Sequence, residues 1–170
     1  LQGTITYNGE TITRDNLCRY RREIGYMGQT APHLDCGVKE FLHIPYSFKA
    51  NKDRSPDKTK TKELLKQLNF DPAVLEKNFT DLSGGEKQRL LMVQMLLLDK
   101  PVYFLDEVTS ALDQKNIRAA VSLICGKPER TVVAIAHNPE WEEYCTRVIT
   151  MDNGRIIDDL KVGYDKKGRG

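Results

Sequence analysis

Short apolar stretches alternate with helical ones over the second half of the sequence, and this order limits the fold more than any other feature. Val102–Leu105 and Thr131–Ala136 are compact and apolar, as expected of buried strands, and Gln114–Cys125 between them has the spacing of an amphipathic helix. A strand, a helix and a second strand in this order favour parallel pairing. Ile24–Met27, closed by Gly28, is a further candidate for a buried strand. The sequence therefore predicts an α/β fold with a mostly parallel sheet.

A helical region separates the first of these strands from the others. The pattern is helical from Val38 to about Leu68, and we expect interruptions at Pro45 and in the polar stretch Asn51–Asp57. Ser55-Pro56 has the form of an N-cap residue followed by proline at the first helical position. This pair predicts the start of a second helix, whose apolar residues are Leu64, Leu65 and Leu68.

A longer helix, rich in leucine and methionine, follows within Leu82–Leu98, and Pro101 is expected to end it. We expect its apolar side chains to pack in the core; these are Leu90, Leu91, Met92, Met95 and Leu96. Residues 33–99 are thus predicted to form a helical lobe inserted into an α/β core made of residues 1–32 and 100–164, and residues 165–170 a polar tail.

Two Asn-Gly pairs predict β-hairpins near the ends of the chain. Asn8-Gly9 joins Thr4–Tyr7 to Glu10–Ile12, and Asn153-Gly154 joins two later stretches, Arg147–Met151 and Arg155–Asp158. Asn-Gly readily adopts the positive φ angles that a tight two-residue turn requires. Each pair therefore predicts an antiparallel hairpin.

Composition excludes several classes of protein. The longest apolar run, Met95–Leu98, is far shorter than the roughly 20 residues of a membrane-spanning helix. The 26 basic and 24 acidic residues are spread along the chain and give a net charge of +2, so no basic block favours nucleic acid as a partner. The cysteines form no Cys-x-x-Cys pair and no zinc-binding pattern with histidine, and we expect all of them to be free thiols; they are Cys18, Cys36, Cys125 and Cys145.

Two carboxylates follow the strand Val102–Leu105 directly. Asp106 is placed at the carboxyl end of the strand, where ligands bind in open α/β sheets, and it is a suitable partner for Mg²⁺. Glu107, one position further on, is placed to polarise a water molecule. The alternative for an acidic pair after a strand is a turn or a helix cap.

The segment Leu82–Gln88 has the features of an anion site. Ser83, Gly84 and Gly85 open a long helix, so a hydroxyl group and backbone N–H groups meet at the positive end of the helix dipole. The alternative is structural: Ser83 caps the helix and the glycines form a turn.

These segments together resemble the ATP-binding-cassette (ABC) ATPases over nearly the whole chain. Leu82–Gln88 resembles the signature sequence of that family, with Glu86 in place of the usual glutamine. Val102–Glu107 resembles its Walker B strand, and Ser110–Asp113 its D-loop. Ile24–Gln29 resembles the strand that leads to the Q-loop glutamine, and Val133–His137 the strand that ends in the switch histidine.

The resemblance implies a role for each matching residue. Glu107 would be the general base and His137 would contact the γ-phosphate of ATP, while Asp106 and Gln29 would hold Mg²⁺. Nucleotide contacts are implied for the signature residues and for the D-loop aspartate, namely Ser83, Gly84, Gly85, Gln88 and Asp113. The resemblance also implies a head-to-tail dimer with a second nucleotide-binding subunit, a membrane permease as partner, no nucleic acid partner, and a cytoplasmic location at the inner face of the membrane.

The P-loop that this family uses to hold phosphates, G-x-x-x-x-G-K-[ST], does not occur in the 170 residues. Gly126-Lys127 is the only Gly-Lys pair, but Val121 stands at the first glycine position and Pro128 at the Ser/Thr position. We therefore expect that the chain has lost an N-terminal portion, that it binds ATP weakly or not at all by itself, and that its sheet exposes apolar surface.

Within the family, a transporter subunit is the leading interpretation. Several stretches resemble the ATPases that work with an iron-export-type permease, among them Tyr26–Thr30, Ile44–Tyr46, Lys77-Asn78 and Glu107–Asp113. Amino-acid and phosphate importers remain open. A different class is open as well: a non-hydrolysing interaction module without a P-loop that pairs with a complete ATPase or a permease.

Overall fold

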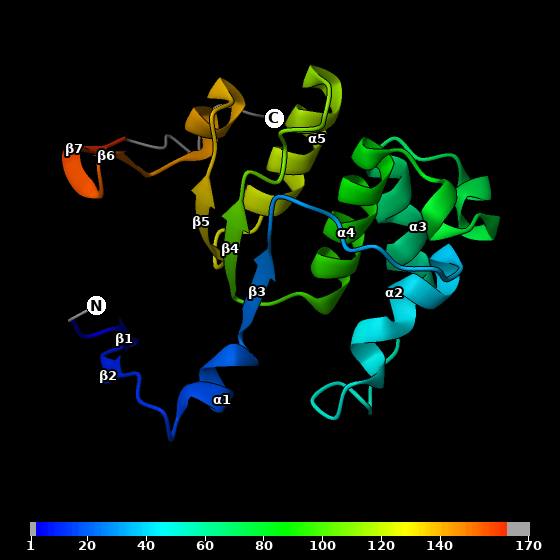
Figure 1. Ribbon diagram of the computed structural model, residues 1–170, viewed down its shortest axis with the longest axis horizontal. Helices are drawn as coiled ribbons and strands as arrows, with labels where there is room; N and C mark the ends of the chain where they lie inside the picture. The colour runs from blue at the N-terminus through cyan, green and yellow to red at the C-terminus, as the bar shows by residue number, and fades with distance from the viewer. Residues whose placement is uncertain (1–2, 163–170) are drawn as a thin grey trace.

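The computed structural model describes residues 3–162. Its centre is a parallel sheet in the order β3-β4-β5, with β3 at Ile24–Met27, β4 at Val102–Asp106 and β5 at Thr131–Ile135 (Figure 1). Tyr26 pairs with Phe104, which in turn pairs with Val133, so the three strands share one register. The predicted α/β class with a parallel sheet is confirmed.

Helices gather on one side of this sheet (Figure 1). The long helix α4, Gly84–Leu98, packs directly against β3, and α5, Gln114–Cys125, connects β4 to β5. Further from the sheet lie α2 (Val38–Ser47), α3 (Lys58–Gln67) and two short 3₁₀ helices, η1 (Pro72–Glu76) and η2 (Phe79–Asp81). The division into a core and a helical lobe, with the bounds given above, stays a prediction.

Pro45 does not interrupt its helix, contrary to the prediction. Helix α2 continues through Pro45 to Ser47, although proline lacks the N–H that would bond to the carbonyl oxygen of Phe41 four residues earlier. Gln94 of α4 supplies the missing donor: its Nε2 lies 2.6 Å from the Phe41 carbonyl oxygen. A side chain distant in sequence thus satisfies the carbonyl group that proline leaves free.

Two helix ends also differ from the predictions. Asp57, not Ser55, is the N-cap of α3, because its carboxylate accepts a hydrogen bond from the Lys60 N–H at 2.9 Å. Helix α4 ends at Leu98, before Pro101 can act, because Asp99 adopts a left-handed backbone with φ 49°. In both cases an aspartate next to the helix sets its end: Asp57 through its side chain and Asp99 through its backbone conformation.

Both predicted hairpins are present, each with its Asn-Gly pair at positive φ. The first pairs β1 (Thr6–Tyr7) with β2 (Glu10–Thr11) and is shorter than predicted. The second pairs β6 (Arg147–Asp152) with β7 (Arg155–Lys161) and is longer. The chain also contains α1 (Leu17–Arg21) and a 3₁₀ helix, η3 (Pro139–Tyr144). The predicted polar tail lies outside the described residues.

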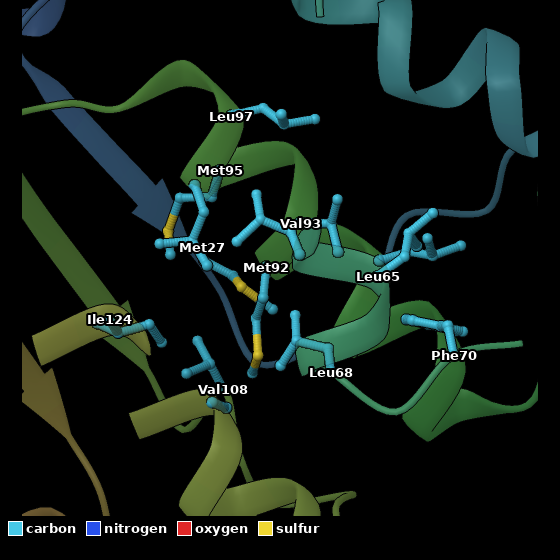
Figure 2. Close-up of a cluster of buried hydrophobic side chains, with 14 of the residues drawn as sticks. Met27, Leu65, Leu68, Phe70, Met92, Val93, Met95, Leu97, Val108 and Ile124 are labelled. Atoms are coloured by element: carbon cyan, nitrogen blue, oxygen red, sulfur yellow. The ribbon is translucent and has the colours of Figure 1, made fainter. Parts of the chain in front are cut away.

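One hydrophobic core joins the helices to the sheet. Figure 2 shows Met27 of β3 beside Met92 and Met95 of α4, with Ile124 of α5 close by. Of the residues expected to pack in the core, Leu90, Met92, Met95 and Leu96 are buried, and Leu91 is partly buried against the same cluster. All four cysteines are free thiols, as expected.

The opposite face of the sheet is exposed, so β3 and β5 are not the fully buried strands that their composition predicted. Tyr26 is 70% exposed and Val133 is 50% exposed, and both share a row with Phe104. Ile135, two positions after Val133 on the same face, is 58% exposed. The apolar surface expected for this sheet is therefore present, and it belongs to one face only.

Candidate functional site

The three central strands end beside one another and carry the polar residues of the candidate site. Gln29 follows β3 by two residues, Glu107 follows β4 directly, and His137 follows β5 by two residues. Because the strands are parallel and in register, these ends lie at the same edge of the sheet. That edge is where ligands bind in open α/β sheets.

The Glu107 carboxylate is held between two side chains. The Gln29 amide donates a hydrogen bond from Nε2 to Oε2 of Glu107 at 2.8 Å. The His137 Nε2 lies 3.3 Å from the other carboxylate oxygen, Oε1. The His137 side chain is 81% exposed, whereas that of Glu107 is 29% exposed. Gln29 and His137, predicted to act on Mg²⁺ and on the γ-phosphate, thus each contact Glu107, the predicted general base.

The backbone of Glu107 is unusual. Its φ is 49°, in the left-handed region that residues other than glycine rarely adopt. Two hydrogen bonds hold this conformation: the Glu107 N–H donates to the Ile135 carbonyl oxygen at 2.9 Å, and its own carbonyl oxygen accepts from the Ser110 N–H at 3.1 Å. Strained backbone of this kind is concentrated at functional sites.

Asp106 and Gln29 provide the oxygen atoms that fit a magnesium ion. Among residues 3–162, no hydrogen bond or ion pair engages the part-buried Asp106 carboxylate, and the Gln29 amide is engaged through its nitrogen, not its oxygen. The same residues contain no group of three or more His, Cys, Asp or Glu side chains that would enclose a metal ion. This donor set fits Mg²⁺, which takes one or two protein oxygens and completes its shell with water and phosphate.

Ser83 caps helix α4 through a capping box, the structural alternative named above. Its Oγ accepts a hydrogen bond from the Glu86 N–H at 3.3 Å, and the Ser83 N–H donates to Glu86 Oε2 at 2.8 Å. The hydrogen bond from the Ser83 backbone lowers the pKa of the Glu86 carboxyl group. The N–H groups of Gly84 and Gly85 lie in the first turn, where a helix has no acceptors of its own.

The two glycines of this turn have different surroundings. A Cβ atom on Gly84 would meet no atom within 4 Å, whereas one on Gly85 would lie 2.9 Å from the Ala111 carbonyl oxygen. Gly85 therefore allows the start of α4 to approach the segment Ser110–Asp113 closely. Asp113 caps α5 by accepting a hydrogen bond from the Asn116 N–H at 2.9 Å, and this bond lowers the pKa of Asp113.

Gln88 is buried, with 3% of its surface exposed. Its Nε2 donates to the Gln29 carbonyl oxygen at 2.9 Å and so ties α4 to the segment that carries the Gln29 side chain. Within the described part of the chain, the buried Oε1 of Gln88 has no hydrogen-bond partner. Gln88 therefore acts on the Glu107 site through the backbone of Gln29. Its place in the sequence near the two glycines did not indicate this role.

Gly126-Lys127, the only Gly-Lys pair in the sequence, lies at the end of helix α5, whereas a P-loop precedes the start of a helix. Gly126 is the C-cap residue of the helix, and the Lys127 ammonium group forms an ion pair with Asp99 at 2.6 Å.

Two residues next to the site were not predicted: Thr109, which follows Glu107 by two positions, and Asn138, which follows His137. Their polar side chains beside predicted site residues were the only available signal.

Comparison with known proteins identifies the family of the chain. The family model described as "ABC transporter" matches residues 1–110, and the chain belongs to that family. It is 28% identical over 152 residues to the probable iron export ATP-binding protein FetA of Escherichia coli K12, covering 88% of this chain and 66% of FetA. It is 30% identical over 172 residues to the nickel import ATP-binding protein NikE of the same strain, covering 95% and 64%. The chain thus spans about two thirds of the length of these relatives.

Solved structures show the same fold. The dimeric post-hydrolysis structure of the ATP-binding cassette MJ0796 with ADP and Pi superposes with a TM-score of 0.77 at 21% identity, covering 94% of this chain and 73% of that one. A bacterial Atm1-family ABC exporter with ATP bound gives a TM-score of 0.76 at 21% identity, covering 94% and 29%. No helix within residues 3–162 is both long and apolar enough to cross a membrane.

Proposed function

We propose that this chain forms part of the ATP-binding and ATP-hydrolysing subunit of an ABC transporter. The observation that carries the proposal is the Glu107 carboxylate held between Gln29 and His137 at the carboxyl edge of the sheet, next to Asp106. A carboxylate in this position suits the orientation of a water molecule toward a phosphorus atom. The family membership and the names of FetA and NikE, both ATP-binding proteins, support it.

In the proposed reaction, Glu107 accepts a proton from water as the water oxygen bonds to the γ-phosphorus of ATP. The bond from that phosphorus to the bridging oxygen breaks and leaves ADP and phosphate. His137 contacts the γ-phosphate. Asp106 and Gln29 would hold Mg²⁺, which would neutralise phosphate charge. Each carboxylate oxygen of Glu107 has one side-chain partner and keeps a further lone pair, so a water molecule can bind there beside Gln29 and His137.

We propose that Ser83, Gly84 and Gly85 serve a nucleotide bound mainly by a second subunit, arranged head to tail, and that Asp113 acts at the same interface. Gln88 contributes through the Gln29 backbone. The free first-turn N–H groups of α4 support an anion site, and the MJ0796 cassette that shares this fold is described as a dimer. The remaining partner is a membrane permease.

The absence of a P-loop in these residues bears on nucleotide affinity. A P-loop supplies several charge-assisted hydrogen bonds of roughly 1.5–3 kcal/mol each, whereas a micromolar site totals about 8 kcal/mol. We therefore propose that the 170-residue chain by itself binds Mg-ATP weakly or not at all. The same observation favours a second candidate function, an interaction module that pairs with a complete ATPase or permease without hydrolysing ATP.

The decisive experiment is Glu107→Gln in the full-length protein that contains this chain. We expect turnover to fall by about 10²–10⁴-fold because the amide cannot accept the proton, while ATP binding is retained because size and shape are preserved. Steady-state hydrolysis and equilibrium ATP titration measure the two effects. Unchanged hydrolysis would remove Glu107 from this role, and a wild-type protein that hydrolyses no ATP would favour the interaction module.

For the transported substrate we propose a metal ion, with iron export as the specific form. FetA is named for iron export and NikE for nickel import, so the two relatives share a metal substrate but not its identity or direction. Cellular iron and nickel measured by mass spectrometry, with and without the gene, separate the possibilities. Iron accumulation in the deletion strain is the expected result, and unchanged levels of both metals would contradict it.

A further inference from the structure

A buried threonine joins the two loops that bring Glu107 and His137 together. Thr109 lies two residues after Glu107 and is 1% exposed. Its hydroxyl group donates to Asn138 Oδ1 at 3.0 Å and accepts from the indole N–H of Trp141 at 3.1 Å. Asn138 directly follows His137, so these bonds connect the end of β4 to the end of β5 beyond the sheet itself.

Asn138 uses its side chain for this contact instead of for its local helix. It is the N-cap residue of η3, a position where asparagine commonly accepts a hydrogen bond from the first turn, but its side chain makes no such bond here. Its carbonyl oxygen instead accepts from the Trp141 N–H at 3.2 Å. Asn138 and Trp141 are therefore fixed to each other and, through Thr109, to the loop that carries Glu107.

The His137 side chain has few contacts of its own, so its position depends on the hydrogen bonds of Thr109 with Asn138 and Trp141. Its side chain is 81% exposed, and the contact with Glu107 is the one ion pair or hydrogen bond that it makes in the described structure. Two side chains beyond it are buried: Trp141 is 5% exposed and Glu140 is 8% exposed, with Glu140 accepting a hydrogen bond from Gln114 of α5 at 3.1 Å. The exposed imidazole is therefore followed by a segment that packs against the fold through Glu140 and Trp141.

We propose that Thr109 is a positioning residue that sets the distance between His137 and Glu107 through Asn138 and Trp141. This inference rests on the proposed ATP hydrolysis. A displacement of about 1 Å between reacting groups lowers rates by up to about 10²-fold, so loss of the anchor acts on turnover more than on substrate affinity.

The test compares Thr109→Val with Thr109→Ser in the full-length protein that contains this chain. Valine keeps the shape of threonine but loses both hydrogen bonds, whereas serine keeps the hydroxyl group. We expect Thr109→Val to lower kcat by about 10-fold with KM changed by less than about twofold, and Thr109→Ser to restore most of the activity. Asn138→Ala, at a half-buried position where folding is less at risk, should reproduce the loss in kcat.

Two controls separate positioning from general stability. Thr61→Val removes a comparable buried hydroxyl in α3, whose Oγ1 donates to the Asp57 carbonyl oxygen at 2.6 Å, and it should lower Tm without lowering kcat. In a His137→Ala background, Thr109→Val should cause no further loss in kcat, because the residue that it positions is gone.

The outcomes distinguish this inference from the proposed function. Wild-type hydrolysis with a normal kcat in Thr109→Val and in Asn138→Ala would overturn the positioning role and leave the proposed function intact. Equal losses of kcat from Thr109→Val with and without His137 would also overturn it. A wild-type protein without hydrolysis would contradict the proposed function itself.

Discussion

Asp99 both ends a helix and forms ion pairs with basic side chains. It adopts φ 49° after α4, and its carboxylate contacts Lys127 at 2.6 Å and Arg130 at 2.9 Å. Burial alone would raise the pKa of Asp99, but the hydrogen bonds from Lys127 and Arg130 outweigh it and lower the pKa from 3.8 to about 2. The carboxylate therefore stabilises the fold most when it is charged.

This shift predicts a pH-dependent contribution to stability. Because the folded pKa is depressed, the contribution is complete above about pH 4 and is lost as the pH falls toward 2. Asp99→Asn, which tolerates the left-handed backbone, should lower the free energy of unfolding at pH 7 by about 1–2 kcal/mol, a figure reduced for the exposed third of the side chain.

Urea denaturation of the two proteins at pH 7 and at about pH 2.5 measures this difference. Asp53→Asn is the control, since Asp53 is exposed and its carboxylate forms no ion pair within the described residues. A gap between Asp99→Asn and wild type that stays constant as the pH falls would show that the charge is not the cause.

At the scale of elements, helix α2 depends on a partner from another helix. The Phe41 carbonyl group that Pro45 leaves free is buried and accepts its hydrogen bond from Gln94 of α4. Gln94→Met keeps the length of the side chain but leaves that carbonyl oxygen unpaired, and we expect the free energy of unfolding to fall by about 1–3 kcal/mol.

Pro45→Ala provides the test of this explanation. An alanine N–H can bond to the Phe41 carbonyl oxygen within the helix, so Gln94→Met should cost less in a Pro45→Ala background than in the wild type. Denaturant unfolding of the four proteins in the cycle measures the coupling. Equal costs in both backgrounds would mean that Gln94 does not replace the missing helical hydrogen bond.

At the scale of the whole molecule, the two faces of the central sheet have different environments. Val132 packs against the core beneath the helices, whereas Val133 and Ile135 face outward on β5. The outward row also includes Tyr26 and Phe104 of the neighbouring strands. Contiguous exposed apolar side chains of this kind promote association between molecules.

We expect the purified 170-residue chain to bind a hydrophobic dye and to associate as its concentration rises. The double substitution Val133→Thr and Ile135→Thr should reduce both effects while changing the free energy of unfolding by less than about 1 kcal/mol, since both side chains are at least half exposed. Dye fluorescence and sedimentation velocity measure them. Val132→Thr, on the opposite face, is the control and should destabilise the fold without reducing association.

Features encoded over a few adjacent residues were predictable from the sequence. The α5 helix has the predicted bounds Gln114–Cys125, and both Asn-Gly turns form where expected. The helix that continues through Pro45 and the outward face of β5 were not predictable, because each depends on what another element does or does not supply at that position. Composition alone describes how apolar a strand is, not which of its faces is covered.

The sequence by itself determined the order of strands and helices, the turn positions and the identity of the polar residues at each strand end. Periodicity, turn preference and family motifs are all properties of short segments. Only the tertiary structure decided that Gln29 contacts Glu107 across 78 positions and that Thr109 reaches Asn138 across 29. Those contacts depend on the parallel register of three strands and on the backbone angles at their ends, which no single segment specifies.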